Sequence, residues 1–490
     1  MKGRDRVDRL PLFRQGVTAG LLEEVLMVPF PSGRSHFAAL LALAAALSPL
    51  PPSPGEEERK EAPDPTTQKE IAGRIHKLFA AEYASRDPSA QRSLAAKLFI
   101  TAESTVDDAA HRFVLFDEAR QVAVKAGDIR GAFQAIEAMG RGYRVNLVEL
   151  KLKVLDSLGR TAVRVEDQRL LLRECAATLG ETAIERGHKE ASQLLSLADS
   201  IAGKLKSPWA SSQLEPFRRL LKTQKKEVED ASRAFALLPS APDDLDANRL
   251  VGRFQCFVLG AWDEGLPRLA RGVHLKLTEI ARKEIAGPKT AERMTVLGDA
   301  WREASVAEKG TVQEAFLMRA YHWHLQAYRL ASGIEKVRLD TALDEAPWRC
   351  LSEMMEFDVK VGWGQFCKDG TAYTEGQAIV DGFKGKKALF LHPPTNGYSS
   401  VRYPLKKKYR TLETHVGLVD HVGDHFRSTL VFEVLGDGKS LWKSIPITRA
   451  GANQRCEVKL NGVEVLELQV HCKGHNGYAQ GVWLDPRVIR

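Results

Sequence analysis

Two patterns of hydrophobic positions divide the chain. From residue 67 to residue 343 apolar residues recur at helical spacing, and glycine and proline occur mainly between the periodic segments. From residue 348 onward, apolar and polar residues alternate in short runs separated by Gly, Asn and Asp, which is typical of strands and turns. The change near Ala346 predicts an all-α region over residues 67–345, followed by an all-β module over residues 346–490.

Helical hairpins are predicted at three places in the α region. The clearest covers residues 117–139, where two stripes of small apolar residues flank Gly127 and Asp128. Small facing residues let antiparallel helices approach closely, and the Gly-Asp pair ends one helix and caps the next. Related segments cover residues 257–272 and 297–333. The hairpins resemble degenerate tetratricopeptide repeats, which indicates either a spacer or a platform for a protein partner.

The β module contains strands with one apolar face. Leu430, Phe432 and Val434 fall on one side of a predicted strand, and residues 466–471 repeat the alternation. Several such strands within residues 346–490 predict a sandwich or jelly roll whose two sheets close over a common core. Trp442 and Trp483 lie within strand segments, so we expect them in the core and not at a ligand platform.

An apolar run precedes both regions. Residues 37–47 read FAALLALAAAL, with Arg34 before them and a segment rich in Pro and Glu after them. About 11 helical residues cross only half of a bilayer, which favours a signal peptide and no stable membrane span. We therefore expect an exported protein, periplasmic or extracellular, with residues 1–48 as leader and 49–66 as linker. The start codon, Met1 or Met27, stays open, as does a buried helix in place of the signal.

Composition and charge exclude few classes. The 490 residues allow two or three domains of roughly 150 residues each, and 44% hydrophobic with 27% charged residues is ordinary for globular proteins. The net charge of +8 comes from scattered Lys and Arg residues. The densest basic run, residues 406–408, lies between two strand-like segments without a nucleic-acid-binding motif. Nucleic acid is therefore not an expected partner.

The six cysteines form no CxxC pair and show no zinc-binding spacing. In an exported protein Cys456 could pair with Cys472, on what we predict to be a neighbouring strand, or Cys350 could pair with Cys367. Buried free thiols are the equal alternative.

Catalytic motifs are missing from the sequence. There is no GxSxG elbow, P-loop, HExxH or dinucleotide-binding GxGxxG, so we expect no catalytic residues. His322 and His324 superficially resemble a metal pair. Residues two apart on a helix point about 200° away from each other, so these imidazoles should not share a metal ion.

An ordered set of motifs in the β module carries a family resemblance. The segments are YSSVRYPL at 398–405, VGLVD at 416–420, VFEVLGDGKSLW at 431–442, GVEVLEL at 462–468 and WLDPR at 483–487. Together they resemble the NPCBM domain, a carbohydrate-binding module of bacterial glycoside hydrolases. The resemblance implies a galactose-binding-like jelly-roll sandwich with a ligand site in the loops at one end, and in some members a structural calcium.

One departure from the family bears on the ligand site. Family members commonly carry a run of the form DHADWAD around the last tryptophan. This chain keeps Trp483 and Asp485, but Ala479, Gln480 and Val482 occupy the preceding Asp, His and Asp positions. The departure indicates that the family's sugar site is altered or lost.

A sugar site needs an aromatic face for the C–H side of a ring and fixed polar groups for its hydroxyls. The candidates for carbohydrate binding lie near predicted turns: Trp363, His392, Asn396, Tyr398, His475, Asn476 and Tyr478. The run DHVGDH at 420–425 fits either an ordinary turn or part of a calcium loop, whose other oxygen ligands other loops would have to supply.

These patterns favour a non-catalytic exported protein. Its β module would bind a glycan or a cell-envelope polysaccharide, and its helical region would act as a spacer or bind a protein partner. The alternative is an envelope scaffold whose β module contacts proteins. A glycoside-hydrolase-associated enzyme is less favoured, because the remaining length is helical.

Overall fold

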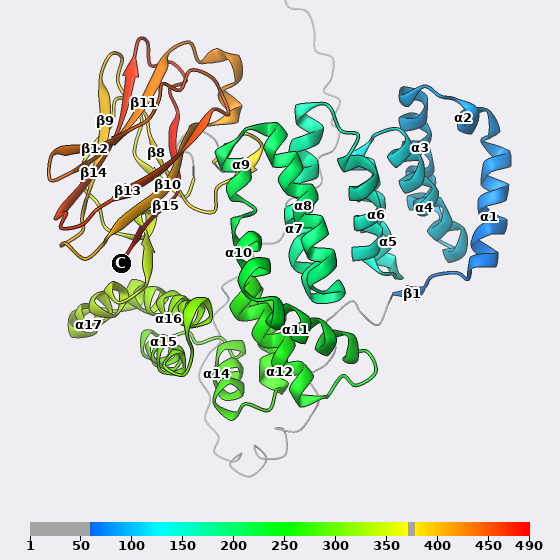
Figure 1. Cartoon of the computed structure of the whole chain (residues 1–490), viewed down its shortest axis with the longest axis horizontal. Coiled ribbons are helices and arrows are strands. Elements are labelled where there is room, and N and C mark those ends of the chain that lie inside the picture. Colours follow the sequence, from blue (N-terminus) through cyan, green and yellow to red (C-terminus); the bar gives the residue numbers. More distant parts are fainter. Residues whose placement is uncertain (1–58, 371–377) are drawn as a thin grey trace, which may run out of the picture. The chain divides into compact units, whose positions relative to one another are not determined.

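The computed structural model describes residues 59–370 and 378–490. Within these residues, a helical region is followed by a β module (Figure 1). The predicted signal segment at 37–47 and most of the predicted linker lie outside the described residues.

The helical region is built mainly from helices that pack against their neighbours in sequence, with one π-helical segment, η2, and one short parallel strand pair. The helices are α1 (Pro65–Leu78), α2 (Ala80–Ala84), α3 (Pro88–Ser104), α4 (Ala109–Lys125), α5 (Ile129–Gly142), α6 (Leu147–Gly159), α7 (Val165–Arg186), α8 (His188–Leu205), α9 (Pro208–Ser212), α10 (Glu215–Thr223), α11 (Lys225–Leu237), α12 (Leu245–Phe254), η2 (Gln255–Leu259), α13 (Trp262–Arg271), α14 (Leu275–Ile285), α15 (Ala291–Ser305), α16 (Gly310–Leu330) and α17 (Gly333–Asp344).

The clearest predicted hairpin is confirmed as α4 and α5. Gly127 has a φ of 66°, and the Asp128 carboxylate accepts the Gly131 backbone N–H at 3.0 Å, which caps α5. Ala132 and Ile136 are fully buried against α4. The segment 297–333 also forms a hairpin, α15 with α16, whereas 257–272 begins in the π-helix η2. The tetratricopeptide class of these hairpins stays a prediction.

The predicted linker is too long at its C-terminal end. Strand β1 (Lys60–Glu61) already pairs in parallel with β2 (Tyr143–Arg144). The Asp64 carboxylate accepts the backbone N–H groups of Thr66 and Thr67 at 2.9 and 3.1 Å, and Pro65 follows as the first helical residue. An Asp-Pro pair is a helix-start signal, so α1 begins inside the segment that composition alone assigns to a linker.

Close packing of α15 on α16 depends on Gly298. A Cβ placed there would lie 2.4 Å from Cδ2 and 2.5 Å from Nε2 of the buried His324. Gly298→Ala should therefore lower the free energy of unfolding by about 1–3 kcal/mol, measured by chemical denaturation of the full chain. Gly73 in α1 has no atom within 4 Å of its Cβ position. Gly73→Ala is the control and should stabilise by about 0.5–1 kcal/mol; equal effects of both variants would disprove the packing argument.

The β module is a sandwich of two antiparallel sheets. One sheet has the strand order β13-β10-β15-β8-β5, with β3 also on β15, and the other has the order β12-β11-β14-β9-β4. The strands and short helices are β3 (Trp348–Cys350), η3 (Leu351–Glu353), β4 (Phe357–Lys360), β5 (Cys367–Lys368), β6 (Ile379–Val380), β7 (Phe383–Lys384), β8 (Ala388–Leu391), β9 (Tyr398–Pro404), β10 (Thr411–Leu418), η4 (Asp420–His425), β11 (Thr429–Gly436), β12 (Lys439–Lys443), β13 (Asn453–Lys459), β14 (Val465–Lys473) and β15 (Gly481–Ile489).

The core of the sandwich follows the predicted alternation. Leu430, Phe432 and Val434 on β11 are all fully buried. The Phe432 ring meets the fully buried Trp483 of β15 edge-on, with centroids 5.3 Å apart. Trp442 is partly buried and packs against the same core. Both tryptophans therefore stabilise the sandwich, as predicted.

The proposed disulfides are wrong. All six cysteines are free thiols. Cys456 lies on β13 and Cys472 on β14, and these strands belong to different sheets, so they are not the neighbouring strands that the alternation predicted. Alternation identifies strands but does not say which strands pair. The alternative of free thiols holds, and five of the six are buried.

Candidate functional site

Three connections between strands lie at the same end of the sandwich. Gly481 at the start of β15 pairs with Leu391 at the end of β8 and with Leu418 at the end of β10. Lys473 at the end of β14 pairs with Thr429 at the start of β11. The connections 392–397, 419–428 and 474–480 therefore meet at one end of the module. We call them, together with 361–366, the rim.

Two candidate asparagines hold the rim together. The Asn396 Oδ1 atom accepts the Gly474 backbone N–H at 2.8 Å, and the Asn396 N–H donates to the Gly474 carbonyl at 3.1 Å. The Asn476 amide donates to the Pro393 carbonyl at 3.0 Å, and its Oδ1 accepts the Thr395 hydroxyl at 3.0 Å. Both side chains are used to join 392–397 to 474–480, so their role here is to fix loop positions.

Trp363 and His392 join the fourth connection to the rim. The Gly362 backbone N–H donates to the His392 carbonyl at 2.8 Å, and the Trp363 and His392 rings are 5.3 Å apart. Trp363 is 55% exposed, whereas His392 is only 7% exposed, and burial lowers the pKa of its imidazole. Trp363 can therefore offer a ring face to a ligand, while the buried His392 ring packs against it.

The 474–480 connection presents an exposed aromatic ring. Tyr478 is 50% exposed and stacks on His425 of η4, with centroids 5.0 Å apart and planes 25° apart. The neighbouring His475 is also exposed; its Nδ1 accepts the Gly477 N–H at 3.0 Å, and its carbonyl accepts the Ser428 hydroxyl. The stacked pair forms a platform between two rim connections.

Two of the three positions at which this chain departs from the family's DHADWAD run are buried. Ala479 and Val482 are fully buried, so neither position can contact a ligand. Gln480 stays partly exposed, and its Oε1 lies 2.6 Å from Nε2 of His421 on η4. The sequence pattern gives no link between His421 or His425 and this connection, because only the strand register brings η4 beside residues 474–480.

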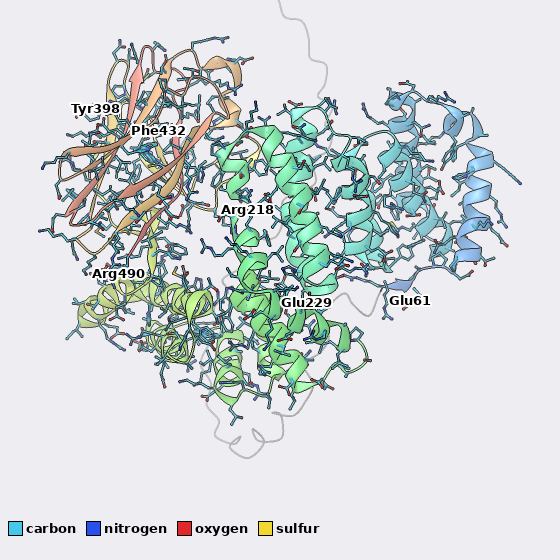
Figure 2. The ribbon with its side chains drawn as sticks, viewed as in Figure 1. Glu61, Arg218, Glu229, Tyr398, Phe432 and Arg490 are labelled. Carbon is cyan, nitrogen blue, oxygen red and sulfur yellow. The ribbon has the colours of Figure 1, made fainter. Side chains whose placement is uncertain are left out.

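Tyr398 lies on the outer face of a sheet. It is 44% exposed, and its ring is 5.3 Å from that of His471, its partner across β9 and β14. Figure 2 labels Tyr398 and Phe432 on the β module. Tyr398 directly follows the 392–397 connection, so it borders the rim.

The first carboxylate of the run 420–425 binds backbone groups of a neighbouring turn. The Asp420 carboxylate accepts the backbone N–H groups of Asp381 and Gly382 at 2.7 and 2.6 Å. Burial raises the pKa of this carboxyl, although the two N–H groups act in the opposite direction. Within residues 59–370 and 378–490, no group of three or more His, Cys, Asp or Glu side chains is placed to hold a metal ion.

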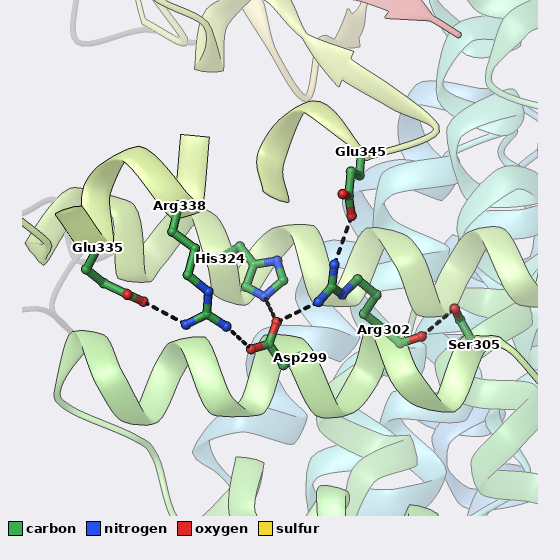
Figure 3. A network of polar contacts seen from close by, with 7 residues as sticks. All are labelled: Asp299, Arg302, Ser305, His324, Glu335, Arg338 and Glu345. Carbon is green, nitrogen blue, oxygen red and sulfur yellow. Dashed lines mark hydrogen bonds and ion pairs between the residues drawn. The ribbon is translucent and has the colours of Figure 1, made fainter. Parts of the chain in front are cut away.

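The pair His322 and His324 is used in packing. His324 is buried, and its Nε2 lies 3.2 Å from Oδ1 of Asp299, which also binds Arg302 and Arg338 (Figure 3). Burial lowers the pKa of His324. The His322 ring packs on Trp323 with centroids 5.2 Å apart. The two imidazoles thus have different partners.

The comparisons with known proteins agree with the sandwich and its motifs. Residues 349–489 match the family model of the NPCBM/NEW2 domain. These residues form an NPCBM domain. The match covers the β module and none of the helical region.

Relatives share only part of the chain. A protein of Renibacterium salmoninarum, named as an endo-alpha-N-acetylgalactosaminidase, is 32% identical over 133 residues, which cover 26% of this chain and 8% of that protein. This chain thus matches only a small part of its curated relative.

Two solved modules of Clostridium perfringens are similar to the NPCBM module. The CBM51 module of a GH95 protein, in complex with methyl-galactose, is 21% identical and covers 29% of this chain and 99% of its own, with a TM-score of 0.25. A ZmpB structure with CBM51-2 in complex with GlcNAc is 20% identical and covers 30% and 32%, with a TM-score of 0.26.

No helix in the described part of the chain has the length and apolar character needed to cross a membrane.

Proposed function

We propose that the NPCBM module binds a glycan at the rim, with Tyr478 as the stacking platform. The observation that carries the proposal is the half-exposed Tyr478 ring, held face to face with His425 between two rim connections. A ring fixed in this way offers its outer face to the C–H side of a sugar without a large loss of side-chain entropy on binding.

Polar groups for the sugar hydroxyls lie beside this ring. Gln480 and His421 form a hydrogen-bonded pair on adjacent connections, and His475 is exposed on the same connection as Tyr478. Asn396 and Asn476 hold the connections in place, and Trp363 supplies a second exposed ring. One or two aromatic faces with a few fixed polar groups suit a short saccharide.

The proposal is tested by titrating the full chain with methyl galactoside and with GlcNAc, and by screening it on a glycan array. We expect saturable binding to at least one glycan. A folded chain that binds no glycan on the array would reject carbohydrate binding.

The whole chain would act as a non-catalytic exported protein. The apolar run at 37–47 supports export, and the helical region would serve as a spacer or bind a protein partner. Cell fractionation of the expressing host tests export, because a protein retained with the cytosolic markers would contradict it.

An envelope scaffold is the second candidate. The burial of Ala479 and Val482, where the family has polar residues, favours it. In that case the rim contacts a protein, and the glycan titrations show no binding. A chain associated with a glycoside hydrolase stays the third and least favoured candidate.

A further inference from the structure

The helical region contacts the module through a small hairpin. Strands β6 and β7 pair with each other, and Asp381 and Gly382 form the turn between them. The Asp381 carboxylate is almost buried and accepts both Nε, at 2.8 Å, and Nη2 of Arg169 on α7. A Cβ on Gly382 would lie 3.1 Å from Cδ of Arg169, so the arginine packs closely over the turn.

The same turn holds η4 of the rim. The N–H groups of Asp381 and Gly382 both donate to the carboxylate of Asp420, the first residue of η4. Asp420 precedes His421, which is bonded to Gln480. A short series of direct contacts thus leads from α7, through the hairpin turn, to the connections that carry the proposed sugar platform.

A second contact comes from α9. Trp209 is 2% exposed, its indole N–H donates to the Phe383 carbonyl at 3.1 Å, and its backbone N–H donates to Asn453 Oδ1 at 2.9 Å. Its ring also lies 5.1 Å from that of His415 on β10, whose pKa is lowered by burial to about 4. A buried tryptophan with both N–H groups satisfied is a fixed contact, which is not expected of a passive spacer.

We infer that Arg169 and Trp209 of the helical region are positioning residues for η4, and through it for His421, His425 and Tyr478. This inference rests on the proposed function for its consequence in binding, but the positioning itself can be measured without a ligand. The helical region then helps to fix the position of the rim.

We expect Arg169→Ala to destabilise the hairpin turn at Asp381 and Gly382. The variant leaves the Asp381 carboxylate almost buried without its charged partner, and an unpaired buried charge is costly. The turn can lower this free-energy cost by opening toward water, because a short two-stranded hairpin is only marginally stable by itself. Opening would withdraw the two N–H groups from Asp420 and loosen η4.

Hydrogen–deuterium exchange of the full chain is the primary test. In Arg169→Ala, the amides of 381–382 and 419–428 should exchange about tenfold faster, while those of the opposite end of the sandwich, 436–439, stay unchanged. Arg186→Ala is the matched control, because Arg186 lies on the same helix and pairs with Glu149 inside the helical region at a similar exposure, 33% against 32%. Equal exchange of 419–428 in both variants would overturn the inference.

A second variant and a binding measurement complete the test. Trp209→Phe keeps a smaller aromatic ring but removes the indole hydrogen bond to Phe383, and it should give a smaller increase in exchange at the same amides. With methyl galactoside or GlcNAc as probe, Arg169→Ala should weaken binding several-fold, Arg169→Lys less, and Arg186→Ala not at all. If the unsubstituted chain binds neither probe, nor any glycan on the array, the proposed function is rejected. Hydrogen–deuterium exchange alone then tests whether Arg169 and Trp209 position η4. Unchanged affinity in Arg169→Ala, with binding by the unsubstituted chain, counts against the inference.

Discussion

Replacing Trp483 by alanine is expected to lower the free energy of unfolding of the module by about 3–5 kcal/mol. Trp483 is among the largest fully buried side chains, pairs with Val416 of β10 on one side and Leu389 of β8 on the other, and packs edge-on against Phe432 of the opposite sheet. Its removal leaves a cavity between the two sheets that neither backbone can close. Chemical denaturation followed by the fluorescence of the other tryptophans measures the loss.

Trp483→Phe is the matched control. The indole N–H of Trp483 is buried without a hydrogen-bond partner, so phenylalanine removes an unsatisfied donor together with part of the ring. The phenylalanine variant should therefore cost clearly less than the alanine variant. If Trp483→Ala unfolds at the same denaturant concentration as the unsubstituted chain, Trp483 is not part of the core.

Glu284→Ala should destabilise the helical region by about 3–5 kcal/mol. The carboxylate is 2% exposed; it accepts Nε of Arg319 at 2.7 Å on one oxygen and the indole N–H of Trp301 at 2.6 Å on the other. Arg319 also lies 4.2 Å from the centroid of the Trp262 ring. Removal of the carboxylate leaves the arginine charge in a mainly aromatic core with no anion beside it.

The double replacement separates charge from packing. Glu284→Met with Arg319→Met removes both charges and keeps most of the volume, so it should cost less than Glu284→Ala alone. Urea denaturation monitored by circular dichroism at the helical band provides the measurement. A double variant that is less stable than the single one would contradict the buried ion pair as the cause.

The periodicity of the sequence predicts secondary structure and buried faces better than it predicts which strands lie side by side in a sheet. Alternation at 430–434 places Leu430, Phe432 and Val434 in the core, and the structure confirms this. The same alternation cannot show that Cys456 and Cys472 lie in different sheets, because pairing depends on contacts between distant segments. The proposed pair of Cys456 and Cys472 failed for that reason.

The rim was predictable in position but not in detail. Turn residues identified Trp363 and Tyr478 of the rim, and Tyr398 just outside it on β9, as exposed rings, and each is 44–55% exposed. His421 and His425 appeared to belong to a metal loop, and only the register of β10 with β15 places them beside residues 474–480. The contact of Trp209 with the module has no local signal in the sequence, because it joins residues more than 170 positions apart.

The glycan affinity of Tyr478 variants decides whether the sugar site lies at the rim. The full chain, Tyr478→Phe and Tyr478→Ala would be titrated with the glycan that binds best on the array, with Tyr398→Ala as the control ring outside the rim. We predict that Tyr478→Phe retains affinity within about threefold and that Tyr478→Ala loses at least about tenfold, equivalent to about 1.4 kcal/mol. Tyr398→Ala should bind like the unsubstituted chain. Unchanged binding by Tyr478→Ala would contradict the placement of the sugar site at the rim.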